Sequence, residues 1–196
     1  EEVNNLIREL GEKAVYEAGV TGLHPNLVKL LGRLKFRVSH GQNVLKHSLE
    51  VSFLAAMLAS EIGANVEVCR KGGLLHDIGK AVDHEIQGHH AKIGAEISRK
   101  FGLPQDVIHC IESHTGPVDP QSVEAMIVCA ANLISNSRPG ATKDNLDTFI
   151  RRLQELDPAV ALLDGGDWFN YGLASIETSA WADAETAMTH ALDAGA

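Results

Sequence analysis

The fold of this chain is organised around residues 72–80, Gly72-Gly73-Leu74-Leu75-His76-Asp77-Ile78-Gly79-Lys80. In this stretch an apolar run ends in a His-Asp pair, which is followed by a glycine turn and a lysine. An imidazole or a carboxylate that is buried without a partner is strongly destabilising. A divalent metal ion satisfies a neutral imidazole and a carboxylate together. The stretch therefore predicts a buried metal site, provided that the rest of the chain supplies further ligands.

The overall composition is that of one globular domain, with or without a small appendage. The chain has 196 residues, of which 44% are hydrophobic, and this is enough to bury a core. Its 17 lysines and arginines against 26 aspartates and glutamates give a net charge of −9. This balance argues against nucleic-acid binding driven by charge over the whole surface, although it is compatible with a local basic cleft.

The cysteines indicate a reducing environment. Cys69, Cys110 and Cys129 each lie in an apolar, helix-like run. Their odd number, without paired spacing, favours free buried thiols over disulfides. No apolar run reaches the roughly 18 residues of a membrane span, and the first residues do not read as a signal peptide. We therefore expect a cytoplasmic protein with no membrane segment in this chain.

Hydrophobic residues recur at helical spacing along most of the chain, with no internal repeat and no convincing strand pattern. Helices are predicted near 1–18, 25–32, 42–62, 66–76, 89–101, 104–115, 120–136, 143–156 and 180–194. The sequence thus predicts an all-α bundle of about seven to nine helices. We expect a domain over residues 1–156 with a helical lead-in, and a loop-rich extension over 157–196 that ends in a helix.

Histidines are unusually frequent, with ten in the chain and most of them between positions 40 and 114. The helical periodicity puts His47, His76 and His114 on inward faces and His90 in the first turn of a helix. Each of them alone is compatible with a hydrogen-bonded core histidine. Together, and beside Asp77, they favour a metal site, because several buried imidazoles would otherwise each need an acceptor.

The types of ligand narrow the choice of metal. Imidazole mixed with carboxylate suits Mn, Fe, Co, Ni or Zn better than Ca, and Mg is also possible. One or two ions fit this set, because Asp77 can bridge two of them and a water between them would have a lowered pKa. Lys80 can balance the charge of a phosphate, or it can simply be a surface lysine at a helix end.

Five stretches, in a fixed order, resemble a known family. They read GLHP at 22–25, LGRLKFR at 31–37, GQNVLKHS at 41–48, GLLHDIGKAVDHE at 73–85 and RPGA at 138–141. This set is similar to the HD superfamily of metal-dependent phosphohydrolases, and most of all to the catalytic HD domain of ribonuclease Y, a bacterial endoribonuclease. The resemblance covers roughly residues 1–156 and implies an HD-domain helical bundle.

The resemblance also implies roles for individual residues and a substrate class. It makes His47, His76 and Asp77 ligands of one ion, and it gives His90 and His114 to a second. It implies catalytic roles for Asp77 and Lys80 in a phosphodiesterase that acts on RNA or a nucleotide, and a possible homodimer. In this reading Lys80 binds the substrate phosphate, and Arg138 either does the same or is only a turn residue.

Two departures from the family pattern leave alternatives open. The run Ala130-Ala131-Asn132 carries an asparagine where the family has its last ligand, an aspartate. A neutral amide oxygen is a weaker ligand than a carboxylate, so the alternative is a degenerate HD domain that acts as a binding or regulatory module. In addition, the membrane anchor, coiled coil and RNA-binding KH domain of ribonuclease Y are not in these residues, which leaves RNA and a smaller nucleotide both open as substrates.

Overall fold

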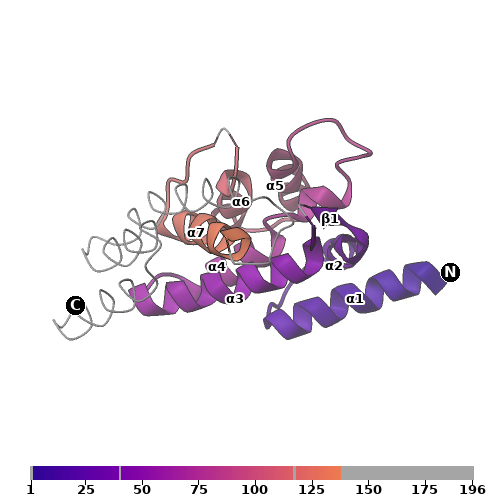
Figure 1. The fold of residues 1–196 in the computed structure, drawn as a ribbon, viewed down its shortest axis with the longest axis horizontal. Helices are drawn as coiled ribbons and strands as arrows, with labels where there is room; N and C mark the ends of the chain where they lie inside the picture. The colour runs from indigo at the N-terminus through magenta and orange to yellow at the C-terminus, as the bar shows by residue number, and fades with distance from the viewer. Residues whose placement is uncertain (1, 40, 117, 138–196) are drawn as a thin grey trace.

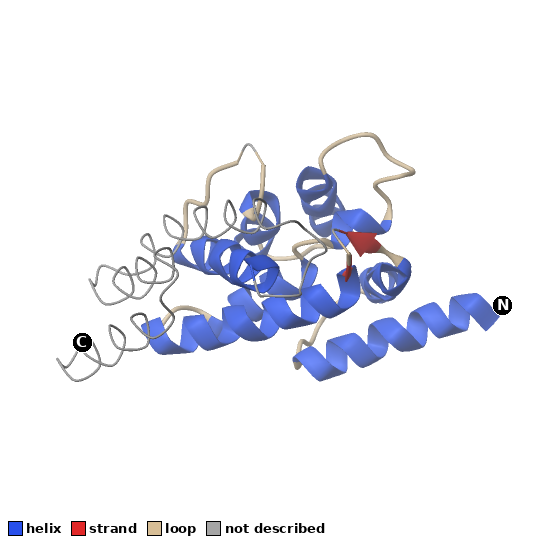
Figure 2. Ribbon diagram, in the orientation of Figure 1, coloured by secondary structure: helices blue, strands red, loops and turns tan. Residues whose placement is uncertain are grey.

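A computed structural model describes residues 2–39, 41–116 and 118–137, and all structural statements below concern these residues. In chain order the elements are α1 (Glu2–Ala18), α2 (Pro25–Arg33), the 3₁₀ turn η1 (Leu34–Phe36), β1 (Val38–Ser39), β2 (Gln42–Asn43), α3 (Val44–Ile62), α4 (Val66–Leu75), the 3₁₀ turn η2 (Ile78–Ala81), α5 (His90–Lys100), α6 (Gln105–Ser113) and α7 (Val123–Ser137). The predicted all-α class is confirmed (Figure 2). The helices expected at 143–156 and 180–194, the boundary at 156 and Arg138 lie outside the described residues.

One short β-hairpin departs from the sequence-based prediction, which contained no strand. Val38 pairs with Asn43 and Ser39 with Gln42 in antiparallel register. Two residues per strand are too few to produce a recognisable alternation in the sequence. The hairpin matters because it leads directly into α3 and carries Ser39 and Gln42 to the edge of the site.

The longest described helix, α3, packs against two other helices of the site, α4 and α7 (Figure 1). It begins at Asn43, whose side-chain oxygen accepts a hydrogen bond from the backbone N–H of Lys46. It ends at Gly63, which has a φ of 74°, the left-handed conformation that glycine adopts without strain. Both α4 and α7 contact α3, so residues on its inward face point toward these two helices.

The glycine pair of α4 brings this helix close to two neighbours. A Cβ atom at Gly73 would lie 2.9 Å from the Cα of Ser52 on α3, and one at Gly72 would lie 2.7 Å from the Cβ of Cys110 on α6. Only glycine permits these approaches. The pair therefore fixes α4 between α3 and α6, and the chain that follows it enters the middle of the bundle.

A single apolar core surrounds this arrangement. Its largest fully buried side chains include Leu27, Leu31, Leu34, Leu74, Leu75, Ile78, Ile111 and Ile127. The three cysteines are free thiols, buried at Cys69 and Cys110 and partly buried at Cys129, as the sequence predicted. None of the helices in the described part of the chain combines the length and the apolar character that crossing a membrane requires.

Candidate metal centre

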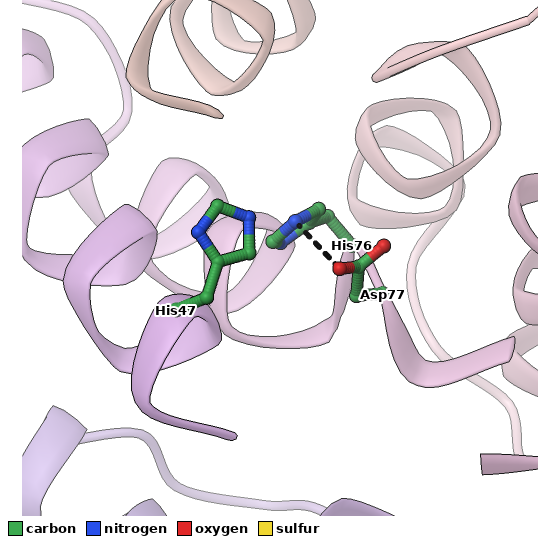
Figure 3. Close-up of side chains that lie close together, drawn as sticks. All are labelled: His47, His76 and Asp77. Carbon is green, nitrogen blue, oxygen red and sulfur yellow. Dashed lines mark ion pairs between the residues drawn. The ribbon is translucent and has the colours of Figure 1, made fainter. Parts of the chain in front are cut away.

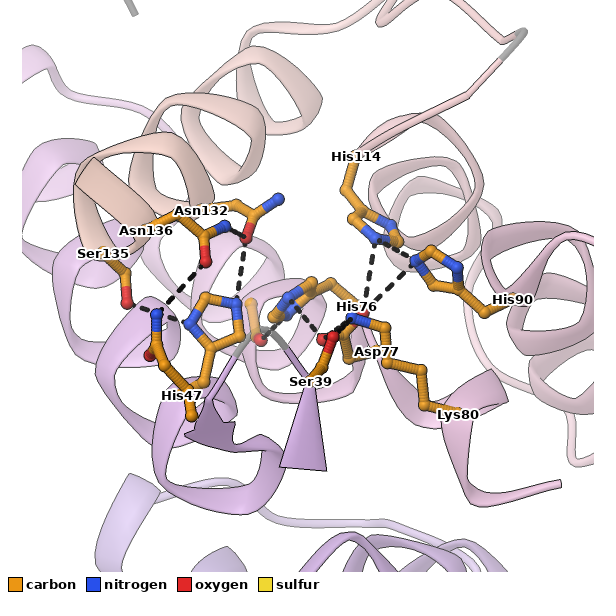
Figure 4. A network of polar contacts seen from close by, with 12 residues as sticks. Ser39, His47, His76, Asp77, Lys80, His90, His114, Asn132, Ser135 and Asn136 are labelled. Atoms are coloured by element: carbon orange, nitrogen blue, oxygen red, sulfur yellow. Dashed lines mark hydrogen bonds and ion pairs between the residues drawn. The ribbon is translucent and has the colours of Figure 1, made fainter. Parts of the chain in front are cut away.

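The predicted site residues come together from five α-helices and the 3₁₀ turn η2 (Figure 4). The histidines come from α3 (His47), from the residue after α4 (His76), from the first position of α5 (His90) and from the residue after α6 (His114). Asp77 lies between the two pairs of rings, next to His76 in the chain. Asn132 on α7 and Lys80 on η2 complete the cluster, so every predicted site residue within the described part of the chain is in one place.

The first set of potential ligands consists of His47, His76 and Asp77 (Figure 3). One ligand atom from each lies within 4.8 Å of the others. His76 is fully buried, and its Nδ1–H donates to the carbonyl oxygen of Gly73 at 2.7 Å. Because that carbonyl can only accept, the proton is on Nδ1 and the lone pair is on Nε2. His76 Nε2 faces Asp77 Oδ2 at 3.5 Å and has no hydrogen-bond partner.

The second set of potential ligands consists of Asp77, His90 and His114. The Nε2 atoms of His90 and His114 lie 3.4 and 3.6 Å from Asp77 Oδ1. His114 Nδ1–H donates to the carbonyl oxygen of Ile111 at 2.7 Å, so Nε2 is the ring nitrogen that faces Asp77 and His90. Asp77 Oδ1 is buried and makes no hydrogen bond. Native proteins seldom leave such atoms unsatisfied, so the unpaired Oδ1 of Asp77 and Nε2 of His76 fit a divalent ion on each side of the carboxylate.

Three of the imidazoles and the carboxylate of Asp77 have the protonation states that binding of a metal ion requires. Burial lowers the pKa of His47, takes that of His76 well below its usual value, and lowers that of His90 to about 3. These imidazoles are therefore neutral at pH 7 and can bind an ion without first losing a proton. Burial also acts to raise the pKa of Asp77, but His76, His114 and Lys80 outweigh it and hold that pKa well below its usual value.

Lys80 is paired with the shared carboxylate. Its Nζ lies 2.8 Å from Asp77 Oδ2 and 3.5 Å from the Oγ of Ser39. The lysine side chain is 20% exposed, whereas that of Asp77 is 2% exposed. The ammonium group thus stands between the buried carboxylate and the opening of the site, and it is not a freely solvated lysine at a helix end.

On the opposite side, a chain of amides holds Asn132. His47 Nε2 lies 3.0 Å from Asn132 Oδ1. The same oxygen accepts a hydrogen bond from Asn136 Nδ2 at 2.9 Å, and Asn136 Oδ1 in turn accepts from Gln42 Nε2 at 3.3 Å. This order of donors and acceptors directs the carbonyl oxygen of Asn132, and not its NH₂ group, toward His47. An oxygen is the atom that a metal ion would require from this side chain.

Ser135 allows His47 to change its tautomer. The ring's Nδ1 lies 2.9 Å from the Oγ of Ser135. While His47 Nε2–H donates to Asn132, the serine hydroxyl donates to Nδ1. If Nε2 gave its lone pair to an ion, Nδ1 would carry the proton and donate a hydrogen bond to the hydroxyl oxygen, because a hydroxyl can donate or accept. Such an outer partner fixes the orientation of a ligating histidine.

These side chains surround a cavity of about 290 Å³. It is lined by Ser39, Gln42, Val44, His47, Asp77, Lys80, His90, His114, Thr115, Asn132, Leu133 and Asn136. The sequence-based reasoning did not single out Ser39, Gln42, Ser135 or Asn136. The last two lie three and four residues after Asn132 on the same helix, and this spacing was the available signal. The two hairpin residues carried no such signal.

Residues 44–137 match the model of the HD domain family. This segment therefore belongs to the HD-domain family, and the resemblance predicted from the sequence is confirmed.

Among curated relatives, the chain is 56% identical to ribonuclease Y of Symbiobacterium thermophilum over 166 residues, which are 85% of this chain and 32% of that protein. It is 54% identical to ribonuclease Y of Chloroflexus aurantiacus over 164 residues, 84% of this chain and 32% of that one. The chain thus spans about a third of the length of these relatives. Among solved structures, the HD domain of the L. monocytogenes phosphodiesterase PgpH matches with a TM-score of 0.49 and 20% identity, over 84% of this chain and 97% of that one.

Proposed function

We propose that this domain is a metal-dependent phosphodiesterase that hydrolyses RNA or a nucleotide. The observation that carries the proposal is the pair of ligand sets that share Asp77 at the wall of an open cavity. Residues that only stabilise a core do not need two groups of imidazoles around one carboxylate. The name of the relatives, ribonuclease Y, supports RNA as the substrate.

His47, His76 and Asp77 would hold one ion, with Asn132 as a neutral fourth ligand, and Asp77, His90 and His114 would hold the other. We propose Mn, Fe, Co, Ni or Zn, because imidazole ligands outnumber carboxylates in both sets. A bound ion supplies Lewis acidity, which stabilises negative charge on a phosphate and lowers the pKa of a water molecule.

The chain's own residues prepare the site for that chemistry. The carbonyl oxygens of Gly73 and Ile111 fix the rings of His76 and His114, so that each directs Nε2 inward. Lys80, at the cavity wall, brings a positive charge to the place where a phosphate oxygen would bind. The carboxylate of Asp77 is buried, and the low local polarity strengthens its interaction with cations.

The second candidate function is a degenerate HD domain that binds a ligand or regulates a partner without turnover. It is favoured by one observation, the neutral amide at position 132. Against it, the oxygen of Asn132 is directed toward His47 by Asn136, which is the arrangement that a working ligand would need. The phosphodiesterase predicts bound metal with turnover, whereas the degenerate domain predicts little metal, or metal without turnover.

The deciding experiment measures metal content and hydrolysis on the same protein. After loading with Mn²⁺ and removal of the excess, the wild-type chain should hold about two ions. It should hydrolyse bis(p-nitrophenyl) phosphate or a labelled single-stranded RNA, and EDTA should abolish the activity. His76→Ala should lose both metal and activity. His84→Ala is the matched control, because His84 is an exposed histidine outside both ligand sets.

Each result has a definite meaning for the two candidates. Metal with turnover supports the phosphodiesterase. Metal without turnover on either substrate favours the binding or regulatory module. A chain that holds no metal after Mn²⁺ loading contradicts the phosphodiesterase and leaves the binding or regulatory module. A His76→Ala variant that holds as much metal as the wild type contradicts the assignment of His76 as a ligand.

A further inference from the structure

The two oxygens of Asp77 are in different electrostatic environments. Oδ2 lies on the side of His76 and is in contact with the ammonium of Lys80 at 2.8 Å. Oδ1 lies on the side of His90 and His114, is buried, and has no hydrogen-bond partner. Figure 4 shows this division, with Lys80 reaching the carboxylate beside His76. One face of the carboxylate is therefore already neutralised by a cation, and the other is not.

Besides the pairing of Asp77 with Lys80, a second feature lowers the negative charge that the first ligand set offers to an ion. Its remaining side-chain oxygen belongs to Asn132, which carries no charge. An ion beside His47 and His76 would thus bind Oδ2 of Asp77, an oxygen that already forms an ion pair with the ammonium of Lys80. An ion beside His90 and His114 would meet an oxygen of the same carboxylate that no hydrogen bond occupies. Because like charges repel strongly at such short distances in a buried site, the two positions cannot be equivalent.

We propose that Lys80 is the resident counter-cation of Asp77, and that an ion bound beside His47 and His76 must displace its ammonium from Oδ2. It follows that the ion beside His90 and His114 binds first and tightly, and that the other binds later and more weakly. This inference rests on the proposed metal-dependent function and adds to it an order of loading and a competitor within the chain.

After displacement from Asp77, the ammonium of Lys80 has another position available within the cavity. Lys80 lines the cavity, its side chain is partly exposed, and the Oγ of Ser39 already lies 3.5 Å from its Nζ. Among the described residues that line the cavity, Lys80 is the only lysine or arginine. Once it leaves Asp77, it can pair with the phosphate of a substrate. Binding of the weaker ion and release of the phosphate-binding cation would then be one event.

The test is calorimetric titration of the metal-free chain with Mn²⁺ alone. The wild type should bind two ions whose dissociation constants differ by about tenfold or more. Lys80→Met should tighten the weaker ion by about tenfold or more, the effect expected when a full positive charge is removed from beside an ion. It should change the tighter ion much less. Lys92→Met is the matched control, because it removes the same charge from an exposed position on α5.

A second variant keeps the test decisive if Lys80→Met does not fold. Lys80→Gln is also neutral but can still donate a hydrogen bond to Asp77, and it should tighten the weaker ion in the same way. If the neutral variants leave the weaker ion unchanged or weaken it, the proposed competition is wrong while the metal site and the proposed function stand. If neither the wild type nor the variants bind any ion, the proposed function fails as well.

Discussion

Asn132→Asp tests the first ligand set most directly. The two side chains have nearly the same shape, and Asn136 Nδ2 can donate to a carboxylate oxygen as it does to the amide oxygen at 2.9 Å. The fold should therefore be retained. The substitution adds a negative charge at Oδ1 of residue 132, which lies 3.0 Å from His47 Nε2. An ion of the first ligand set would bind close to this oxygen.

The size of the effect follows from the charge that is added. Two unit charges about 4 Å apart attract by about 4 kcal/mol at an effective dielectric constant of about 20. Removing water from the new carboxylate offsets part of this attraction. A net gain of about 2–3 kcal/mol corresponds to a dissociation constant about 30- to 150-fold lower for the weaker ion. The ion beside His90 and His114 should be much less affected.

Two assays measure this prediction. Titration with Mn²⁺ gives the two dissociation constants, and hydrolysis of bis(p-nitrophenyl) phosphate at limiting Mn²⁺ should become faster as the weaker position fills. Asn26→Asp, at an exposed position near the start of α2, is the control for added charge in general. An unchanged or higher dissociation constant for the weaker ion would refute the assignment of Asn132 as a ligand.

Four further predictions concern the supports of the site and the core. Asn136→Ala removes the amide that orients Asn132, so it should weaken the ion beside His47 by several-fold in the same titration and leave the other unchanged. Gly79→Ala would place a Cβ atom 2.0 Å from the carbonyl oxygen of His90, so α5 would have to move. This movement should lower the free energy of unfolding by about 1–3 kcal/mol in urea denaturation. It should also weaken binding of the ion held by His90. Burial raises the pKa of the thiols to about 12 at Cys69 and about 11 at Cys129. The folded chain should therefore resist alkylation by iodoacetamide at pH 8 and react after unfolding. Because these thiols stay protonated in the folded state while unfolded thiols ionise above about pH 9, the free energy of unfolding should fall between pH 9 and pH 11, and urea denaturation at several pH values measures it.

Helical periodicity was sufficient to predict the part of the site that lies on helix faces. It assigned His47 and His114 to the interior and put His90 in the first turn of a helix, where the structure has it. The family resemblance then singled out Asn132. These predictions succeed because the direction of a side chain on a helix depends mainly on local spacing.

The supporting contacts depend on how distant segments pack, and the sequence did not predict them. Gln42 reaches Asn136 only because the hairpin and the last turns of α7 both lie beside the start of α3. The pairing of Lys80 with Asp77 depends on the turn η2, which leaves the lysine beside the carboxylate three residues earlier. Neither contact has a signature in hydrophobic periodicity, because each joins polar side chains at the boundary of the core.

The position of Asp77 between the two ligand sets also has a consequence for folding. One ion would tie α3 to the end of α4, and the other would tie that same end to α5 and α6. Metal binding would then act as a cross-link between segments that are far apart in the unfolded chain, and an ion at 100 times its dissociation constant adds about 2.7 kcal/mol to the free energy of unfolding. Because both cross-links meet at a single carboxylate, its loss would disconnect four helices at once, and the holo protein should melt well above the apo protein.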